Sequence, residues 1–136
     1  MKKKLLIVGS LVGLAIVIGI ITYAIESERK INLVSVSRNE ITSVIVTNGN
    51  NGDMIEGSSE EIDALIDLLS PIECKKINRE QSGGWKYSID IICDNTSSKI
   101  ILISDEICSV DNSYYRIDNK EGEAIVSLIE KFYNLY

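Results

Sequence analysis

Carboxylates are the side chains with which this chain of 136 residues could most readily do chemistry. Hydrolysis of a glycoside needs two acidic groups across one sugar-binding cleft, and Asp90 and Asp94 share one face of an expected strand. At strand rise, however, they lie about 13 Å apart, which is too far to act on a single bond. With no histidine, the chain has no Ser-His-Asp or Cys-His pair either. We therefore expect no catalytic residue and no enzyme activity.

Two further patterns bear on metal and cofactor binding. The segment 48–53 (Asn-Gly-Asn-Asn-Gly-Asp) is rich in oxygen atoms, but it has neither the acidic first position nor the bidentate glutamate of a calcium loop. Turn geometry explains its composition better, because Asn and Gly tolerate the positive φ of tight hairpins. Without histidine or a CxxC pair, a zinc site is also not expected. We predict no metal and no cofactor.

Three cysteines form an odd set, so a complete disulfide framework is excluded. If the hairpin turns are centred on 95–96 and 105–106, Cys93 lies opposite Ser98 and Cys108 opposite Ile103. No cysteine is then expected to face another across neighbouring strands. Cys74, Cys93 and Cys108 are therefore predicted to be small buried hydrophobic residues.

Hydrophobic periodicity predicts the elements that would position a site. A capping box at 58–61 precedes a helix that ends at Ser70, before Pro71, and an apolar stripe from Ile125 to Phe132 predicts a C-terminal helix. The predicted fold class is α+β, a mostly antiparallel sheet with two helices packed on one face, preceded by one N-terminal transmembrane helix. Strands are expected at 41–47, 54–56, 72–78, 85–94, 99–104, 107–110 and 114–117.

The first 25 residues predict a membrane anchor. Three lysines at 2–4 precede an uncharged run from Leu5 to Ile25, which matches the ~30 Å hydrocarbon thickness of a bilayer. The positive-inside rule leaves the N-terminus in the cytoplasm and places the rest outside. Thr22-Tyr23-Ala24 offers a signal-peptidase site, so a secreted product of cleavage is the alternative. The length of the run favours a retained, single-pass anchor in the cell membrane.

Length and charge limit the domain organisation and the binding partners of the chain beyond the anchor. Residues 26–40 are expected to be a tether, with at most one edge strand, and residues 41–136 one extracytoplasmic α+β domain. Residues 31–136 carry nine basic and eighteen acidic side chains, a net charge of −9. Such a surface repels phosphate backbones, so nucleic-acid binding is not expected. A basic partner or a cation is allowed by this charge but is not implied by it.

Five residues are candidates for contact with a partner. Arg79 and Glu80 lie in the one long polar loop, and such loops often carry recognition. Trp85 is of a type that anchors many interfaces, although its phase with the following strand predicts core packing. Tyr114 and Tyr115 are expected near the surface of the last hairpin.

The layout resembles small membrane-anchored extracytoplasmic domains of unknown function from Gram-positive bacteria. The resemblance rests on the basic and apolar start, on residues 41–46 (Ile-Thr-Ser-Val-Ile-Val), on the strand entry at 84–89 and on Tyr115-Arg-Ile117 before a closing helix. It implies no activity. The leading hypothesis is a non-enzymatic binding module for a protein or peptide partner. Alternatives are a small-molecule or cation sensor that uses Asp90, Asp94 and Asp105, and a hydrolase with an unrecognised carboxylate site.

Overall fold

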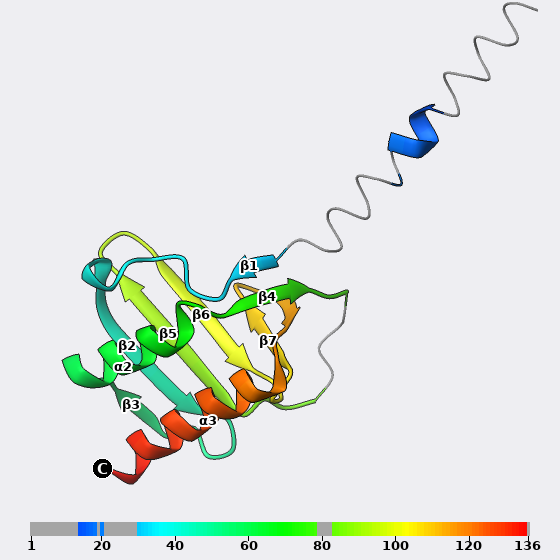
Figure 1. The fold of residues 1–136 in the computed structure, drawn as a ribbon. Coiled ribbons are helices and arrows are strands. Elements are labelled where there is room, and N and C mark those ends of the chain that lie inside the picture. Colours follow the sequence, from blue (N-terminus) through cyan, green and yellow to red (C-terminus); the bar gives the residue numbers. More distant parts are fainter. Residues whose placement is uncertain (1–13, 19, 21–29, 79–82, 136) are drawn as a thin grey trace, which may run out of the picture.

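One antiparallel sheet of eight strands is the framework of the described residues, which are 14–18, 20, 30–78 and 83–135 of the computed structural model (Figure 1). The strands lie in the order β1-β4-β8-β7-β6-β5-β2-β3, so β1 and β3 are the two edges. The strands are β1 (Lys30–Asn32), β2 (Ile41–Asn48), β3 (Met54–Glu56), β4 (Glu73–Lys76), β5 (Tyr87–Cys93), β6 (Ser97–Leu102), β7 (Ile107–Val110) and β8 (Ser113–Arg116).

Two helices cover one face of this sheet. Figure 1 shows α2 (Ser59–Leu69) and α3 (Asn119–Asn134) side by side across it. A short 3-10 helix, η1 (Arg38–Glu40), leads into β2. The predicted α+β class, with an antiparallel sheet and two helices, is confirmed.

The capping box predicted at 58–61 is confirmed as well. The Ser58 hydroxyl accepts a hydrogen bond from the Glu61 amide at 3.2 Å, and the Glu61 carboxylate accepts one from the Ser58 amide at 2.9 Å. This capping box satisfies two backbone donors at the start of α2. At the start of α3, the Asp118 side chain accepts a hydrogen bond from the Lys120 amide.

The core lies between the sheet and the helices. Central strand residues Ile89 and Ile100 are fully buried, as are Leu69 of α2 and Ile129 of α3. Their burial follows the period of two in the strands and of about 3.6 in the helices that the sequence predicted. The face of the sheet away from the helices carries the alternate strand residues.

The stretch expected to be a tether needs correction from Lys30 onward. Residues 30–32 form edge strand β1, which pairs with β4 through Ile31 and Cys74. Leu33 and Val34, the next two residues, are 2% and 7% exposed and belong to the core. They are held there because the Leu33 amide donates a hydrogen bond to the Ile72 carbonyl at 2.9 Å. Residues 30–40 therefore belong to the folded domain.

Two hairpin registers also differ from the predicted ones. Ser98 faces Ile91 instead of Cys93, because the turn brings the Cys93 amide to the carbonyl of Thr96. Cys108 faces Leu102 instead of residue 103. The reason lies in the β6–β7 turn, where the Ser104 hydroxyl accepts from the amides of residues 106 and 107 and tightens the connection.

The burial predicted for the cysteines holds fully at two positions. Cys74 and Cys108 are 0% exposed, whereas Cys93 is half-buried and packs against the core from its edge. All three are free thiols. The Cys74 thiol donates a hydrogen bond to the Ile31 carbonyl at 3.5 Å, and strand β8 separates its strand from that of Cys108.

Most of the expected anchor lies outside the described residues. Only residues 14–18 and 20 of the segment 1–25 are described, and they are helical. Within the described part of the chain, no helix has the length and apolarity needed to span a membrane.

Candidate partner-binding edge

Strand β3 ends the sheet and presents backbone hydrogen-bonding groups to the outside. The Asn48 amide donates to the Asp53 carbonyl at 2.8 Å, and the Gly57 amide donates to the Val44 carbonyl at 2.9 Å. Since bonding alternates along an antiparallel pair, Ile55 is the residue of β3 that bonds to β2. The N–H and C=O groups of Met54 and Glu56 therefore point away from the sheet.

The side chains at this edge are also accessible. Met54 is 65% exposed, the largest exposure of a big apolar residue in any strand that the structure describes. Glu56 is exposed, and the Ser43 hydroxyl donates a hydrogen bond to its carboxylate at 3.1 Å. Ile55, between them, packs partly against the core. Met54 and Glu56 thus lie together on the face of the sheet that bears no described helix.

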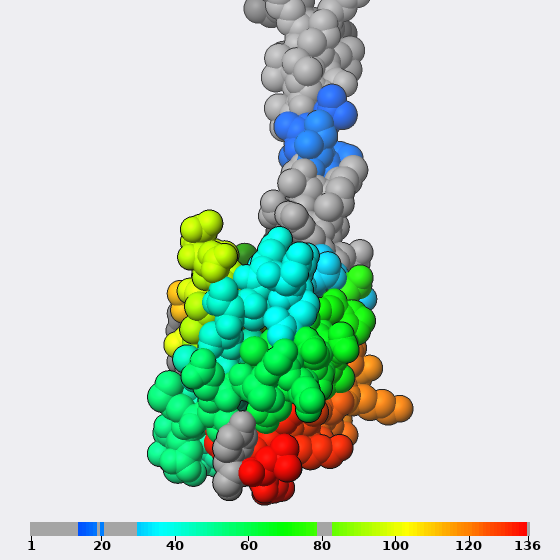
Figure 2. Space-filling view, turned by 90° about the vertical axis from the view of Figure 1, so that its left-hand side faces the viewer, coloured from blue at the N-terminus to red at the C-terminus, as the bar shows by residue number. Residues whose placement is uncertain are grey.

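Acidic residues dominate this side of the molecule. The sequence from 41 to 72, which forms β2, β3 and α2, has no lysine or arginine. Figure 2 looks onto this side, where the β2–β3 segment and α2 form one continuous surface. We call it the acidic edge, defined by the exposed side chains of Asp53, Glu56, Glu60, Asp63 and Asp67.

Basic residues gather at the other end of the sheet. Lys30 of β1 lies opposite Lys75 of β4, and Lys75 in turn lies opposite Arg116 of β8. Lys76 is the next residue of β4. The strand order therefore separates charge across the sheet, with cations near β1 and carboxylates near β3.

The C-terminal helix fixes the β2–β3 hairpin in place. The Tyr133 hydroxyl donates toward the carbonyl oxygens of Asp53 at 2.8 Å and Val46 at 3.2 Å. Its ring lies against Tyr87, with 6.0 Å between ring centroids. Burial raises the pKa of Tyr133, and the nearby Tyr87 and Asp53 raise it further. The hairpin that carries the candidate edge is thus held by side chains from β5 and α3.

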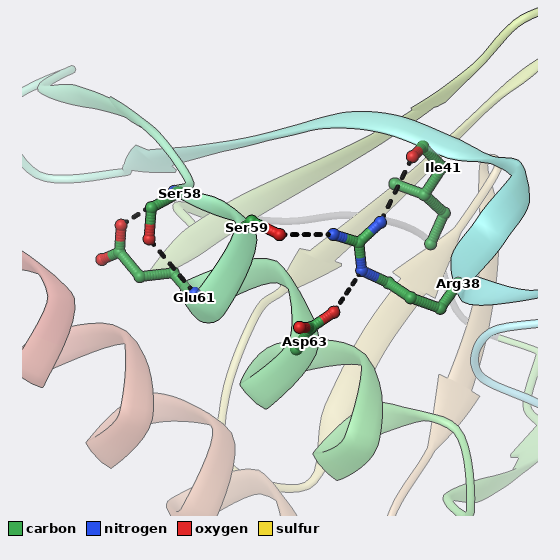
Figure 3. A network of polar contacts seen from close by, with 6 residues as sticks. All are labelled: Arg38, Ile41, Ser58, Ser59, Glu61 and Asp63. Carbon is green, nitrogen blue, oxygen red and sulfur yellow. Dashed lines mark hydrogen bonds and ion pairs between the residues drawn. The ribbon is translucent and has the colours of Figure 1, made fainter.

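One cation reaches the acidic edge from η1 (Figure 3). The Arg38 Nε atom donates to the Asp63 carboxylate at 2.5 Å, and another guanidinium nitrogen lies 3.3 Å from the Ser59 hydroxyl. A third contact, at 3.4 Å, reaches the Ile41 carbonyl. The guanidinium thereby connects η1, β2 and the first turns of α2, and its charge is directed at Asp63.

The cavities near these elements do not suit an enclosed small molecule. An apolar space between β2, β3, α2 and α3 has a volume of about 10 Å³ and is lined by Ile55, Leu65 and Phe132 among others. A polar hollow of about 310 Å³ lies between η1 and the β5–β6 turn, lined by Glu40, Cys93 and neighbouring residues. The first is far below the volume of typical ligand pockets, and the second is open to solvent.

The carboxylates proposed for a cation sensor are not grouped. Asp90 pairs with Lys99 at 3.6 Å, and Asp105 pairs with Lys86 at 3.0 Å. Asp94 lies at the edge of the polar hollow. No cluster of three or more metal-ligating side chains occurs among the residues that the structure describes.

The partner candidates from the sequence do not converge on one place. Tyr114 lies opposite Ser109 on the helix-free face, whereas Tyr115 packs partly against the core. Trp85 lies just before the start of β5, and strands β7 and β6 separate β5 from β8, which carries the two tyrosines. Arg79 and Glu80 lie outside the described residues.

The core packing expected for Trp85 is wrong. Strand β5 begins two residues later, at Tyr87, and Trp85 is only half-buried. Its carbonyl and ring instead lie against Gly49 in the β2–β3 turn, where a Cβ atom would be 2.8 Å from the ring carbon Cε3. The turn can approach Trp85 this closely because Gly49 has no side chain.

Comparisons with known proteins give no further guide to this edge. No family model, curated protein or solved structure matches the chain. The resemblance to Gram-positive extracytoplasmic domains therefore stays a prediction.

The sequence did not single out Met54 and Glu56. Their strand was predicted at the correct residues, but its position at the end of the sheet depends on long-range pairing that local patterns do not contain. One signal was present, since the absence of basic residues from 41 to 72 marks a one-sided surface. The net charge of the whole chain does not reveal this signal, because it does not say where along the sequence the charges lie.

Proposed function

We propose that this chain is a membrane-anchored extracytoplasmic module that binds a protein or peptide partner and has no enzyme activity of its own. The observation that supports it best is the free edge of β3, where Met54 and Glu56 offer unpaired backbone groups. An extended segment of a partner can add to such an edge as a further strand. The edge is short, which limits unspecific pairing with other sheets.

The anchor of the proposed module rests on the sequence. Lysines at 2–4 followed by an uncharged run to Ile25 predict export of the domain with its N-terminus in the cytoplasm. Protease added to intact cells should then degrade the domain. Alkaline carbonate should leave the protein in the membrane fraction if the anchor is retained, whereas cleavage of the segment would leave the domain outside that fraction.

Site-specific photo-crosslinking in intact cells tests the binding role. The full-length protein carries benzoylphenylalanine at Met54, and a matched protein carries it at Ser127, on the exposed side of α3. We expect one recurrent, identifiable partner to be captured from Met54 and not from Ser127. Equal capture at both positions, or none at either, would contradict the proposal.

A backbone variant shows whether the edge itself binds. Glu56→Pro removes an N–H group that points away from β2, so it takes a donor from the partner while leaving the β2–β3 bonds in place. Glu56→Ala removes the same carboxylate but keeps the N–H. Capture should be lost in Glu56→Pro and retained at least in part in Glu56→Ala, with thermal unfolding used to confirm that both variants fold.

A further inference from the structure

We propose that the segment bound at β3 is an extended cationic strand with a basic and a large apolar side chain two residues apart. The proposal rests on the proposed function and adds the chemistry of the partner. It follows from three features of the acidic edge: the direction of the free backbone groups, the side chains beside them, and the charge around them.

The backbone sets the conformation of the bound segment. Met54 and Glu56 each present one outward N–H and one outward C=O group, as the bonds of Asn48 and Gly57 to their partners show. A segment that satisfies these groups must be extended, with its side chains alternating between the two faces of the sheet. Residues that lie opposite Met54 and Glu56 are therefore two apart in the bound chain and share one face.

The side chains of the edge set what those two residues must be. Met54 is 65% exposed and offers apolar surface, whereas Glu56 offers a carboxylate. Directly opposed side chains on neighbouring strands lie close enough to contact each other, and pairs of opposite charge are favourable. An apolar residue opposite Met54 and a lysine or arginine opposite Glu56 would satisfy both positions.

The surrounding charge favours the same partner. Among the described residues, no lysine or arginine lies within ion-pair distance of Glu56 or Asp53, and Arg38 is directed at Asp63. The residues that lie opposite one another across the sheet from Glu56 are, in order, Ile45, Asp90 and Lys99. The first cation met along this line is therefore Lys99, and it pairs with Asp90. The carboxylates of Asp53 and Glu56 are thus available to attract a basic segment and to repel an acidic one.

Three synthetic peptides test this pattern against full-length, ¹⁵N-labelled protein in lipid nanodiscs. The probe is acetyl-Thr-Arg-Thr-Ile-Thr-amide, in which Arg and Ile share one face of a strand. A control of identical composition, acetyl-Thr-Thr-Arg-Ile-Thr-amide, places them on opposite faces. A second control, acetyl-Thr-Glu-Thr-Ile-Thr-amide, reverses the charge and keeps the spacing.

We expect the probe to shift the amide signals of Met54 and Glu56 and to bind about tenfold more tightly than either control. Added salt should weaken this preference because the charges are exposed. In Glu56→Lys, the order of the Arg and Glu peptides should reverse. This reversal is the sharpest sign that Glu56 contacts the basic residue.

The inference and the proposed function can fail separately. Equal binding of the three peptides, shifts confined to β1 and β4, or no binding at all would overturn the cationic strand. Crosslinking from Met54 that yields only dimers of this chain would overturn it too, because a second copy would then occupy the edge. If Met54 captures a different partner whose bound segment is acidic, the binding role stands and the inference fails.

Discussion

Gly122 in the first turn of α3 packs its backbone directly against the carbonyl group of Asp105 in the β6–β7 turn. A Cβ atom on Gly122 would overlap the Asp105 carbonyl oxygen and lie 2.6 Å from the carbonyl carbon. The Asp105 side chain is at the same time tied to Lys86 at 3.0 Å. The position is therefore closed to any side chain, because backbone atoms on both sides would have to move.

Gly122→Ala should lower the free energy of unfolding by about 2 kcal/mol, the usual cost of overpacking a filled site. Helix propensity alone predicts the opposite, a gain of about 1 kcal/mol from replacing Gly by Ala inside a helix. Chemical denaturation decides between the two signs. Gly84→Ala is the matched control, since a Cβ atom on Gly84 would meet nothing within 4 Å, and it should leave stability nearly unchanged.

The case of Gly122 shows what the sequence can and cannot predict here. Local signals placed β3, α2 and α3 at nearly their observed residues, because turn chemistry, capping and apolar periodicity act over a few positions. A contact such as that of Gly122 with Asp105, or of Gly49 with Trp85, joins segments far apart in the chain, and no periodicity reports it. The free edge of β3 was missed for the same reason, since an edge is defined by the strands that do not pair with it.

Tyr133→Phe should destabilise the protein by about 1 kcal/mol at neutral pH, because it removes the hydroxyl that reaches the Asp53 and Val46 carbonyls. Urea denaturation measures the difference from the wild type. The ring contact with Tyr87 is kept in the variant, so the change isolates the hydroxyl. An unchanged midpoint would show that these hydrogen bonds add nothing to the stability of the hairpin.

The same pair of proteins gives a prediction about pH. Burial raises the pKa of Tyr133 above its ordinary value of 10.0, so the folded state holds this proton more tightly than the unfolded state. Its contribution is fully present below pH 10 and is lost as the pH rises through the folded pKa. The stability gap between wild type and Tyr133→Phe should therefore narrow above about pH 10. A gap that stays constant from neutral to strongly alkaline pH would contradict this.

The cysteines should differ in reactivity in the native protein. Cys74 and Cys108 are 0% exposed, and the neighbouring Cys74 thiol together with burial raises the pKa of Cys108. Cys93 borders the polar hollow, where a reagent can approach it. Brief treatment with N-ethylmaleimide, followed by mass spectrometry, should label Cys93 alone, and denaturation should allow labelling of all three thiols. Native labelling of Cys93→Ser would show that the core opens on the timescale of the reaction.

The capping box offers a test of how firmly α2 begins behind the acidic edge. Ser58→Ala removes the acceptor of the Glu61 amide, and loss of such a cap typically costs about 1 kcal/mol. Ser59→Ala is the matched control, because its hydroxyl makes only the 3.3 Å contact with Arg38 at an exposed position. Thermal unfolding should separate the two variants, with Ser58→Ala clearly lower in Tm.

Hydrogen exchange should then show faster opening of the first turn of α2 in Ser58→Ala alone, since only that variant leaves the Glu61 amide without its acceptor. Equal effects of the two substitutions would contradict the prediction, because the Ser58 cap would then add no more stability than the contact of Ser59 with Arg38.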